Sequence, residues 1–218
     1  RDPVLGVRVN LIGSLNVFEA AKTRRLPAAY LSTAGVFGPA DAVHPEPMTI
    51  YGATKLAVEG AARAYFLDHG VPSLGLRPYI VYGPGESAGI AAGPSIAIAA
   101  ALRREPAEIR FSGRVGFVYV DDVARMLASA MTARLEGATV LTMAGDTADM
   151  EDFVAELARQ SGWSEIAING VPLRIPFELA SDPVPTVLGA QPVTDIRGGI
   201  GRAIAELKAG REEELSNV

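Results

Sequence analysis

Apolar residues recur at the spacing of a helix over the first 25 residues of the chain. Leu5, Val9 and Ile12 follow one another at intervals of four and three, which places them on one side of a helix. A second apolar side consists of Leu11, Leu15 and Phe18. The pattern therefore predicts a helix over residues 5–25.

Short apolar runs that end at Gly or Pro alternate with helical patterns along the rest of the chain. Extended segments are expected at 28–38, 72–85 and 138–145, and a short extended run that leads into a helix at 117–131. Further helices are expected at 51–69, 94–104, 150–162 and 198–214. Strands that alternate with helices predict an α/β protein with a parallel, doubly wound sheet. Such sheets bind ligands at the carboxyl ends of their strands.

Composition narrows the class of protein. Of the 218 residues 49% are hydrophobic, enough to bury one sizeable core, and the net charge of −5 disfavours a nucleic-acid partner. The sequence contains no cysteine, which excludes disulfides, thiolate metal sites and a cysteine nucleophile. Its most apolar stretch, residues 89–102, is too short to span a bilayer. A cytoplasmic protein without a membrane partner is expected.

No metal site is expected. Asp121 and Asp122 are adjacent, but no matching histidine or acidic cluster accompanies them. One of them is expected to cap the following helix. His44 is interpreted as an exposed loop residue.

Candidate chemistry lies in a helix and in the strand end before it. Tyr51 and Lys55 are four residues apart, so on a helix they share a face and can reach one ligand together. A free tyrosine has a pKa of about 10, and a nearby ammonium favours its phenolate, so such a pair can exchange a proton with a hydroxyl or carbonyl. Ser32 or Thr33 can orient the same oxygen. On its own, the four-residue spacing of Tyr51 and Lys55 can also arise by chance. Ser and Thr after a strand are ordinary turn residues.

Five segments occur in an order that raises the odds of a catalytic site. They are "VNLIGSLNVFEAA", "LSTAGVFGP", "PMTIYGATKLAVE", "LRPYIVYGPG" and "FVYVDDVA". In this order they resemble the NAD-dependent epimerase/dehydratase branch of the extended short-chain dehydrogenase/reductase superfamily, which includes UDP-glucose 4-epimerase. The likeness is densest between Asn10 and Ala124. It implies a Rossmann-like doubly wound sheet and a small C-terminal α/β region that binds substrate.

The resemblance also implies roles for individual residues. Tyr51 becomes the acid–base catalyst, Lys55 assists it, and Thr33 falls on the position of the catalytic hydroxyl, with Ser32 as second choice. The residues implied on the cofactor side are Tyr51, Lys55, Pro78, Tyr79 and, more weakly, Asn10. The implied cofactor is NAD, with NADP left open.

On the substrate side the resemblance points to four residues, Thr33, Ala34, Ile80 and Arg114. Ile80 stands where many enzymes of the family that act on nucleotide sugars have an asparagine. Arg114 can pair with a phosphate, but an exposed loop charge is an equally good interpretation. The substrate is therefore expected to be a small molecule, with a nucleotide sugar as the first choice.

One part of the family pattern does not occur in the sequence. The glycine-rich turn Gly-x-x-Gly-x-x-Gly, which binds the dinucleotide after a first strand, is missing. At about 30 residues per βαβ unit, roughly 90 residues of sheet and helix are lacking, so a longer protein is expected. Residues 1–85 are expected to form the later part of the NAD(P)-binding domain. Residues 86–218 are expected to bind mainly substrate, with 115–145 returning to the sheet.

Three functions stay open at this point. The first is epimerisation of a nucleotide sugar through transient hydride transfer, and the second is net oxidation or reduction of a sugar, a sugar acid or another carbonyl compound. The third is a cofactor-binding module without catalysis, against which the intact Tyr-x-x-x-Lys pair speaks. By the same resemblance, helices 5–25 and 51–69 are expected to form the four-helix interface of a homodimer.

Overall fold

The fold comes from a computed structural model that describes residues 2–85 and 87–216, with the side chains of 211–216 left out. The chain forms two compact units. The first unit consists of Arg1–Tyr79, Asp121–Ala144 and Arg174–Pro192. The second consists of Ile80–Val120, Gly145–Leu173 and Val193–Val218.

The sheet of the first unit contains the strand that leads to the candidate site. Its strands are β1 (Ala28–Leu31), β2 (Ser73–Pro78) and β6 (Ala138–Met143), in the order β1-β2-β6. Both pairings are parallel, and Leu31 lies beside Leu76. Leu74 and Leu76 are fully buried, as expected for a strand between two helical layers. The predicted parallel α/β arrangement is confirmed.

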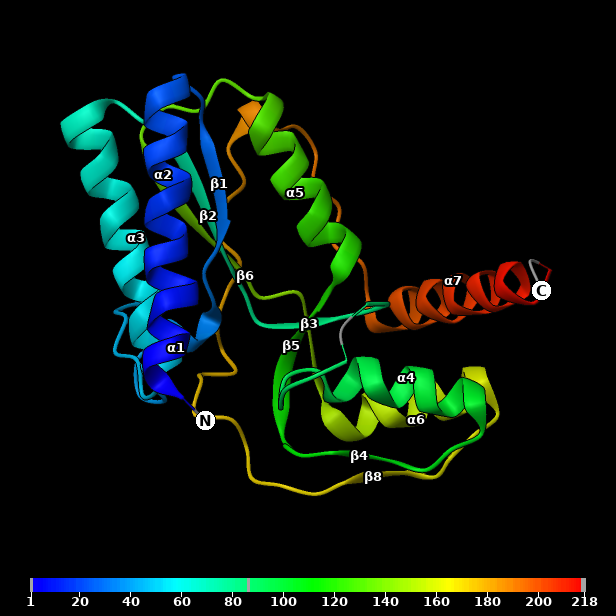
Figure 1. Ribbon diagram of the computed structural model, residues 1–218. Coiled ribbons are helices and arrows are strands. Elements are labelled where there is room, and N and C mark those ends of the chain that lie inside the picture. Colours follow the sequence, from blue (N-terminus) through cyan, green and yellow to red (C-terminus); the bar gives the residue numbers. More distant parts are fainter. Residues whose placement is uncertain (1, 86, 217–218) are drawn as a thin grey trace. The chain divides into compact units, whose positions relative to one another are not determined.

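Helices cover both sides of this sheet (Figure 1). On one side lie α2 (Gly13–Arg24) and α3 (Ile50–His69), and on the other lies α5 (Val120–Thr132). Helix α3 begins where the Thr49 side chain accepts a hydrogen bond from the Gly52 N–H, and it ends at Gly70 in the left-handed conformation. These signals explain why the predicted helix 51–69 and the observed one agree so closely.

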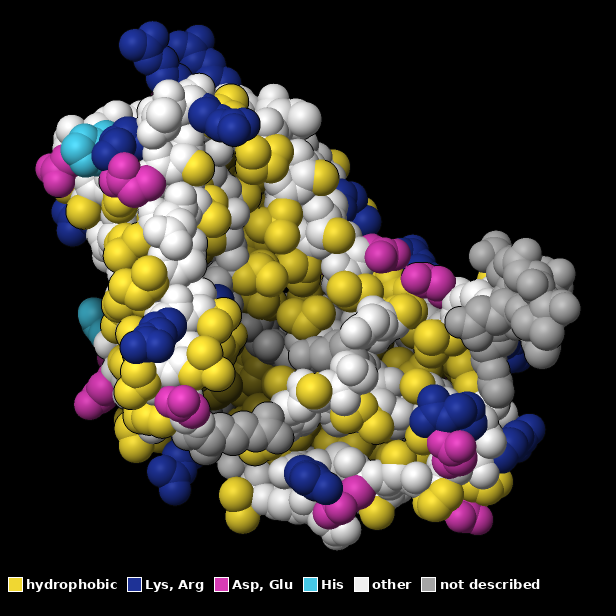
Figure 2. Space-filling model, viewed as in Figure 1, with side chains coloured by type: hydrophobic (Ala, Val, Ile, Leu, Met, Phe, Trp, Pro, Cys, Tyr) yellow, Lys and Arg dark blue, Asp and Glu magenta, His cyan; other side chains and the backbone are white. Residues whose placement is uncertain are grey.

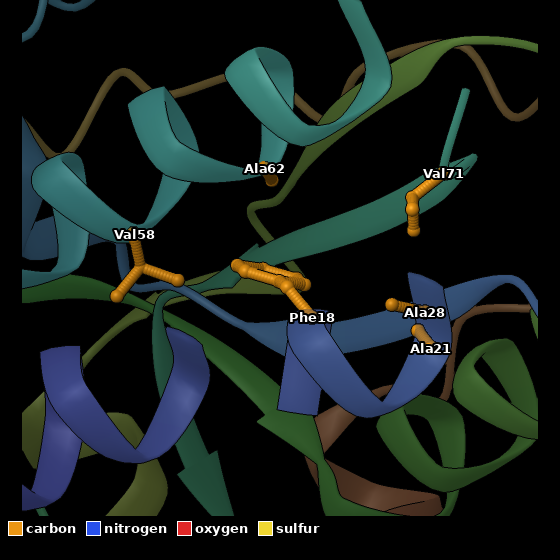
Figure 3. Packing of buried hydrophobic residues seen from close by; sticks show 6 residues of the cluster. All are labelled: Phe18, Ala21, Ala28, Val58, Ala62 and Val71. Carbon is orange, nitrogen blue, oxygen red and sulfur yellow. The ribbon is translucent and has the colours of Figure 1, made fainter. Parts of the chain in front are cut away.

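The core between α2, α3 and the sheet is built around Phe18. Figure 3 shows its ring reaching from α2 toward Val58 and Ala62 of α3. The ring is 1% exposed and meets Tyr30 of β1 edge to face, with 5.6 Å between the ring centres. This contact packs the N-terminal helix against β1, the strand that leads to the candidate hydroxyls of Ser32 and Thr33.

The N-terminal helix is continuous but not uniform. It consists of α1 (Pro3–Val7), a π-helical turn η1 (Arg8–Ile12) and α2, and in η1 the Gly13 N–H bonds to the Arg8 carbonyl five residues back. Leu11 and Leu15 pack against the core, as the second predicted apolar side requires. By length and composition alone, the helix Pro3–Arg24 is also able to cross a membrane. Only 11% of its most apolar window is buried in the protein, so its other apolar side faces outward.

The second unit contains two small sheets. One consists of β3 (Ile80–Tyr82), β5 (Arg114–Tyr119) and β7 (Asp146–Asp149), and the other of β4 (Ala107–Ile109) and β8 (Ile166–Ile168). Its helices are α4 (Gly93–Arg103), α6 (Met150–Ser161) and α7 (Ile196–Ser216). The core of this unit stacks the rings of Phe117 and Phe153 at 4.8 Å between centres.

One strand of the second unit, β7, lies outside the expected extended segments and pairs antiparallel. Strand β7 runs antiparallel to β5, with Asp149 beside Arg114. Three of the four residues in its sequence, Asp-Thr-Ala-Asp, are polar, and the segment has little intrinsic strand preference. Pairing with the buried strand β5 creates it, which no local pattern could have indicated.

Replacing Phe18 by Ala should lower the free energy of unfolding by about 3–5 kcal/mol, because it opens a cavity at the centre of the first unit's core. Chemical denaturation followed by circular dichroism measures this loss. The neighbouring Val17 is 54% exposed on the same helix, so Val17→Ala should change stability by less than about 0.5 kcal/mol. Equal effects of the two substitutions would contradict the packing described.

Candidate active site

Helix α3 carries Tyr51 and Lys55 one turn apart, next to the carboxyl end of β1. Tyr51 is 51% exposed, and the Lys55 Nζ atom lies 5.7 Å from the centre of its ring. The two side chains therefore lie together on one face of the helix, where a ligand above the strand end can meet both.

Lys55 is tied to the strand. Its Nζ donates a hydrogen bond of 2.9 Å to the carbonyl of Leu31, the last residue of β1. Burial lowers the pKa of Lys55 below its ordinary value, because it disfavours the charged form. An ammonium group has three donors, so the bond to Leu31 leaves two for a ligand.

The two adjacent hydroxyls have different surroundings. The Ser32 hydroxyl, in a residue 3% exposed, donates its hydrogen to the carboxylate of Glu59. The Thr33 hydroxyl instead accepts a hydrogen bond of 3.1 Å from the Gly35 N–H and caps the short 3₁₀ helix η2 (Ala34–Val36). Among the described hydrogen bonds Thr33 is thus only an acceptor, which leaves its own hydrogen for a substrate oxygen.

Helix α3 approaches the turn after β1 very closely. A Cβ atom added at Gly52 would overlap the carbonyl oxygen of Gly35 and stand 3.0 Å from the Cβ of Pro47. Gly52 follows Tyr51 directly, so the absence of a side chain at position 52 determines how near the tyrosine stands to the turn of Thr33.

Two charged residues without an assigned role lie beside these groups. Glu59, one turn after Lys55, forms a buried ion pair with Arg77 of β2. Burial opposes the charge of Arg77, but the hydrogen bond and ion pair with Glu59 outweigh it and raise its pKa. An arginine within a mostly apolar, buried strand is the signal in the sequence that could reveal this pair.

Other expected residues of the first unit lie in or near the same strand ends. Pro78 is the last residue of β2, and Ala34 lies buried in η2. Tyr79 is buried, and its hydroxyl donates a hydrogen bond of 3.2 Å to the Ile175 carbonyl. Burial raises the pKa of Tyr79, so this phenol stays protonated and its visible role is to hold the segment at Ile175.

Asn10 lies in the π-helical turn η1, which contacts α3. Its side-chain amide donates a hydrogen bond of 3.1 Å to the Gly6 carbonyl, and its own carbonyl accepts one of 2.6 Å from the Ser14 hydroxyl. The side chain thereby bonds to the backbone of the helix, and its role on the cofactor side stays a prediction.

Ile80 and Arg114 belong to the second unit. Ile80 begins β3 and is 3% exposed. Arg114 begins β5 rather than lying in a loop, and its guanidinium contacts the Asp149 carboxylate at 3.3 Å. The Asp149 side chain makes no capping hydrogen bond to α6.

The two adjacent aspartates at the start of α5 are placed differently than expected. Asp121 and Asp122 lie inside the first turn of α5, not in front of it. Asp122 is buried and bonds to Arg125 at 2.5 Å. Within the part of the chain that the structure describes, no group of three or more His, Cys, Asp or Glu side chains could hold a metal ion.

A parallel α/β sheet binds ligands at the carboxyl ends of its strands, and a Tyr/Lys helix and a Ser-Thr turn lie at one such end here. Residues 1–142 match the family described as "NAD dependent epimerase/dehydratase family". The chain belongs to this NAD-dependent family, which confirms the resemblance inferred from the five segments.

Individual relatives include both epimerases and a reductase. A dTDP-L-rhamnose 4-epimerase from Burkholderia thailandensis is 33% identical over 136 residues, which cover 60% of this chain and 38% of that protein. A GDP-6-deoxy-D-mannose reductase from Pseudomonas aeruginosa is 32% identical over 114 residues, which cover 48% and 36%. The chain thus spans well under half the length of these two relatives.

A solved structure supports the Rossmann-like fold. MoeE5 in complex with UDP-glucose and NAD is 28% identical, with a TM-score of 0.78 over 94% of this chain and 72% of that chain. The expected fold class is therefore confirmed for nearly the whole chain.

Replacing Gly52 by Ala should destabilise the protein by about 1–3 kcal/mol, because the new methyl group would press on the Gly35 carbonyl. Gly60 provides a matched control on the same helix, since a Cβ there has nothing within 4 Å. Gly60→Ala should stabilise by up to about 1 kcal/mol through helix propensity. Thermal and urea unfolding measure both, and a stabilising Gly52→Ala substitution would show that the close approach is not real.

Proposed function

We propose that the protein carrying these residues epimerises a nucleotide sugar by transient hydride removal and return, with Tyr51 as the acid–base. The observation that carries the proposal is the cluster at the end of β1: an exposed tyrosine, a lysine beside its ring, and a threonine hydroxyl with a hydrogen to donate. Relatives named as 4-epimerases support the choice of reaction.

The residues present fit the nicotinamide end of a dinucleotide. Lys55 keeps two donors for ribose hydroxyls after bonding to Leu31. Pro78 ends β2, and its contact with the nicotinamide, like that of Tyr79, stays a prediction. The glycine-rich turn for the pyrophosphate is not contained in the 218 residues. When bound, NAD supplies the acceptor and donor of hydride at the carbinol carbon of the sugar.

The proton chemistry falls to side chains of this chain. Tyr51, as phenolate, takes the proton of the sugar hydroxyl as that carbon becomes a carbonyl, and it returns the proton when the carbonyl is reduced again. The charge of Lys55 favours the phenolate. Thr33 donates a hydrogen bond to the same sugar oxygen and holds it near the phenol.

A net oxidoreductase is the second candidate function, favoured by the similarity to a reductase from Pseudomonas aeruginosa. The same three residues serve both reactions, so the site does not choose between them. The stoichiometry of the cofactor does: an epimerase leaves NAD unchanged after each cycle, whereas a dehydrogenase accumulates NADH.

In the complete polypeptide that carries these residues, Tyr51→Phe should lower kcat by about 10²- to 10⁴-fold, because the proton acceptor is lost. The matched control is Tyr65→Phe on the same helix, whose hydroxyl bonds to Glu19 at the surface. Turnover of UDP- and dTDP-sugars with NAD, followed by chromatography of the products, measures both variants. Full activity of Tyr51→Phe would refute the acid–base role of Tyr51, whereas absence of turnover by the parent polypeptide would favour a cofactor-binding module without catalysis.

We also propose that the protein is a homodimer through its N-terminal helix and α3. Hydrophobic side chains gather over α1 and the adjoining helix surface in Figure 2, and Val4, Leu5, Val9 and Ile12 are each about half exposed or more. A large exposed apolar surface of this kind is typical of an interaction site. In a two-fold symmetric dimer, a second copy of the chain buries it with the identical surface.

Val9→Lys should therefore convert a dimer into a monomer, since it places a charge at the centre of the apolar side. Val171→Lys is the control: Val171 is 78% exposed against 65% for Val9, and it lies outside the N-terminal helix. Light scattering coupled to size exclusion gives the masses. A monomeric parent protein, or equal masses for the two variants, would refute the proposed interface.

A further inference from the structure

A buried ion pair joins the catalytic helix to the central strand of the sheet. Glu59 lies two turns after Tyr51 on α3, and Arg77 lies on β2. Their side chains are 6% and 15% exposed. The guanidinium donates two hydrogen bonds to the carboxylate, from Nε to Oε1 at 2.8 Å and from Nη2 to Oε2 at 2.5 Å. Such bidentate bonds fix orientation as well as distance.

The same carboxylate also holds the turn after β1. The Ser32 hydroxyl donates to Glu59 Oε1, so one side chain receives hydrogen bonds from β2 and from the residue directly after β1. The Arg77 guanidinium lies 5.1 Å from the ring centre of Phe37, which follows the 3₁₀ helix. The turn that contains Thr33 is therefore held at both of its ends by this pair.

Stability alone does not explain an ion pair at this place. Apolar residues of similar volume in place of a buried ion pair often keep or raise stability, because desolvating two charges is costly. An apolar pair, however, would provide no directional bond to Ser32. What the ion pair provides beyond packing is the fixed orientation of the Ser32–Thr33 turn.

We propose that Glu59 and Arg77 are positioning residues that hold the Thr33 hydroxyl in register with Tyr51. This inference rests on the proposed function, in which Thr33 and Tyr51 contact the same sugar oxygen. A misplacement of about 1 Å between such groups can lower a rate by about 100-fold. Ser32, whose hydrogen goes to Glu59, belongs to the positioning group and not to the groups that contact substrate.

The decisive variant replaces both charges at once, Glu59→Leu with Arg77→Met, so that no unpaired charge stays buried. Its melting temperature should stay within about 3 °C of the parent, while kcat falls at least ~10-fold and KM changes less than ~2-fold. The control is the more exposed pair on α6, Glu156→Leu with Arg159→Met, which should leave kcat unchanged. A purely structural role predicts that the folded double variant keeps its kcat.

A second readout does not depend on turnover. The Gly35 N–H donates to the Thr33 hydroxyl, so its hydrogen exchange reports the geometry of the turn. In the double variant this exchange should accelerate at least ~10-fold, while the Gly70 N–H at the far end of α3 keeps its rate. Ser32→Ala, which keeps the ion pair intact, should accelerate the same amide and serves if the double variant fails to fold.

These outcomes separate the inference from the proposed function. Faster Gly35 exchange in a protein that turns over no nucleotide sugar would support the fixed turn and refute the function. In a folded variant, an unchanged Gly35 exchange rate, or an unchanged kcat in an active enzyme, would overturn the positioning role.

Discussion

The closeness of helix α3 to the end of strand β1 is the constraint on which the candidate site depends. Three contacts along one side of α3 establish it: Gly52 against the Gly35 carbonyl, Lys55 on the Leu31 carbonyl, and Glu59 on Ser32. They are spaced by three or four residues, which is one turn of the helix. All three contacts lie on the side of the helix that also bears Tyr51. The packing that stabilises the first unit therefore also positions the candidate catalytic side chains.

The same contacts give different roles to two hydroxyl groups that look equivalent in the sequence. Ser32 and Thr33 are adjacent hydroxyls, yet alternation along the chain turns Ser32 toward the Glu59 carboxylate and leaves Thr33 at the start of the 3₁₀ helix η2. Lys55 is partly buried, and burial alone disfavours its charge. The Leu31 carbonyl accepts one hydrogen bond from its Nζ and holds the lysine beside the phenol.

Much of this could be predicted from the sequence, because the signals are local. The predicted helix 51–69, which bears Tyr51 and Lys55, agrees with the observed Ile50–His69, since Gly70 marks its end. The parallel order of β1 and β2 follows from the alternation of strand and helix patterns. By contrast, β7 exists only through its partner β5, and the pairing of Glu59 with Arg77 spans 18 residues of chain. Neither leaves a periodic pattern, so tertiary contacts alone determine them.

The most direct test of the proposed reaction follows a single hydrogen atom. A UDP-sugar that carries deuterium at the carbinol carbon is incubated with the complete polypeptide and NAD, and the products and cofactor are then analysed by mass spectrometry. Transient hydride transfer predicts an inverted sugar that retains its deuterium, and an NAD pool that contains none at the end. Deuterium that accumulates in NADH, or a sugar that inverts and loses its label to water, would contradict epimerisation by removal and return of the same hydride.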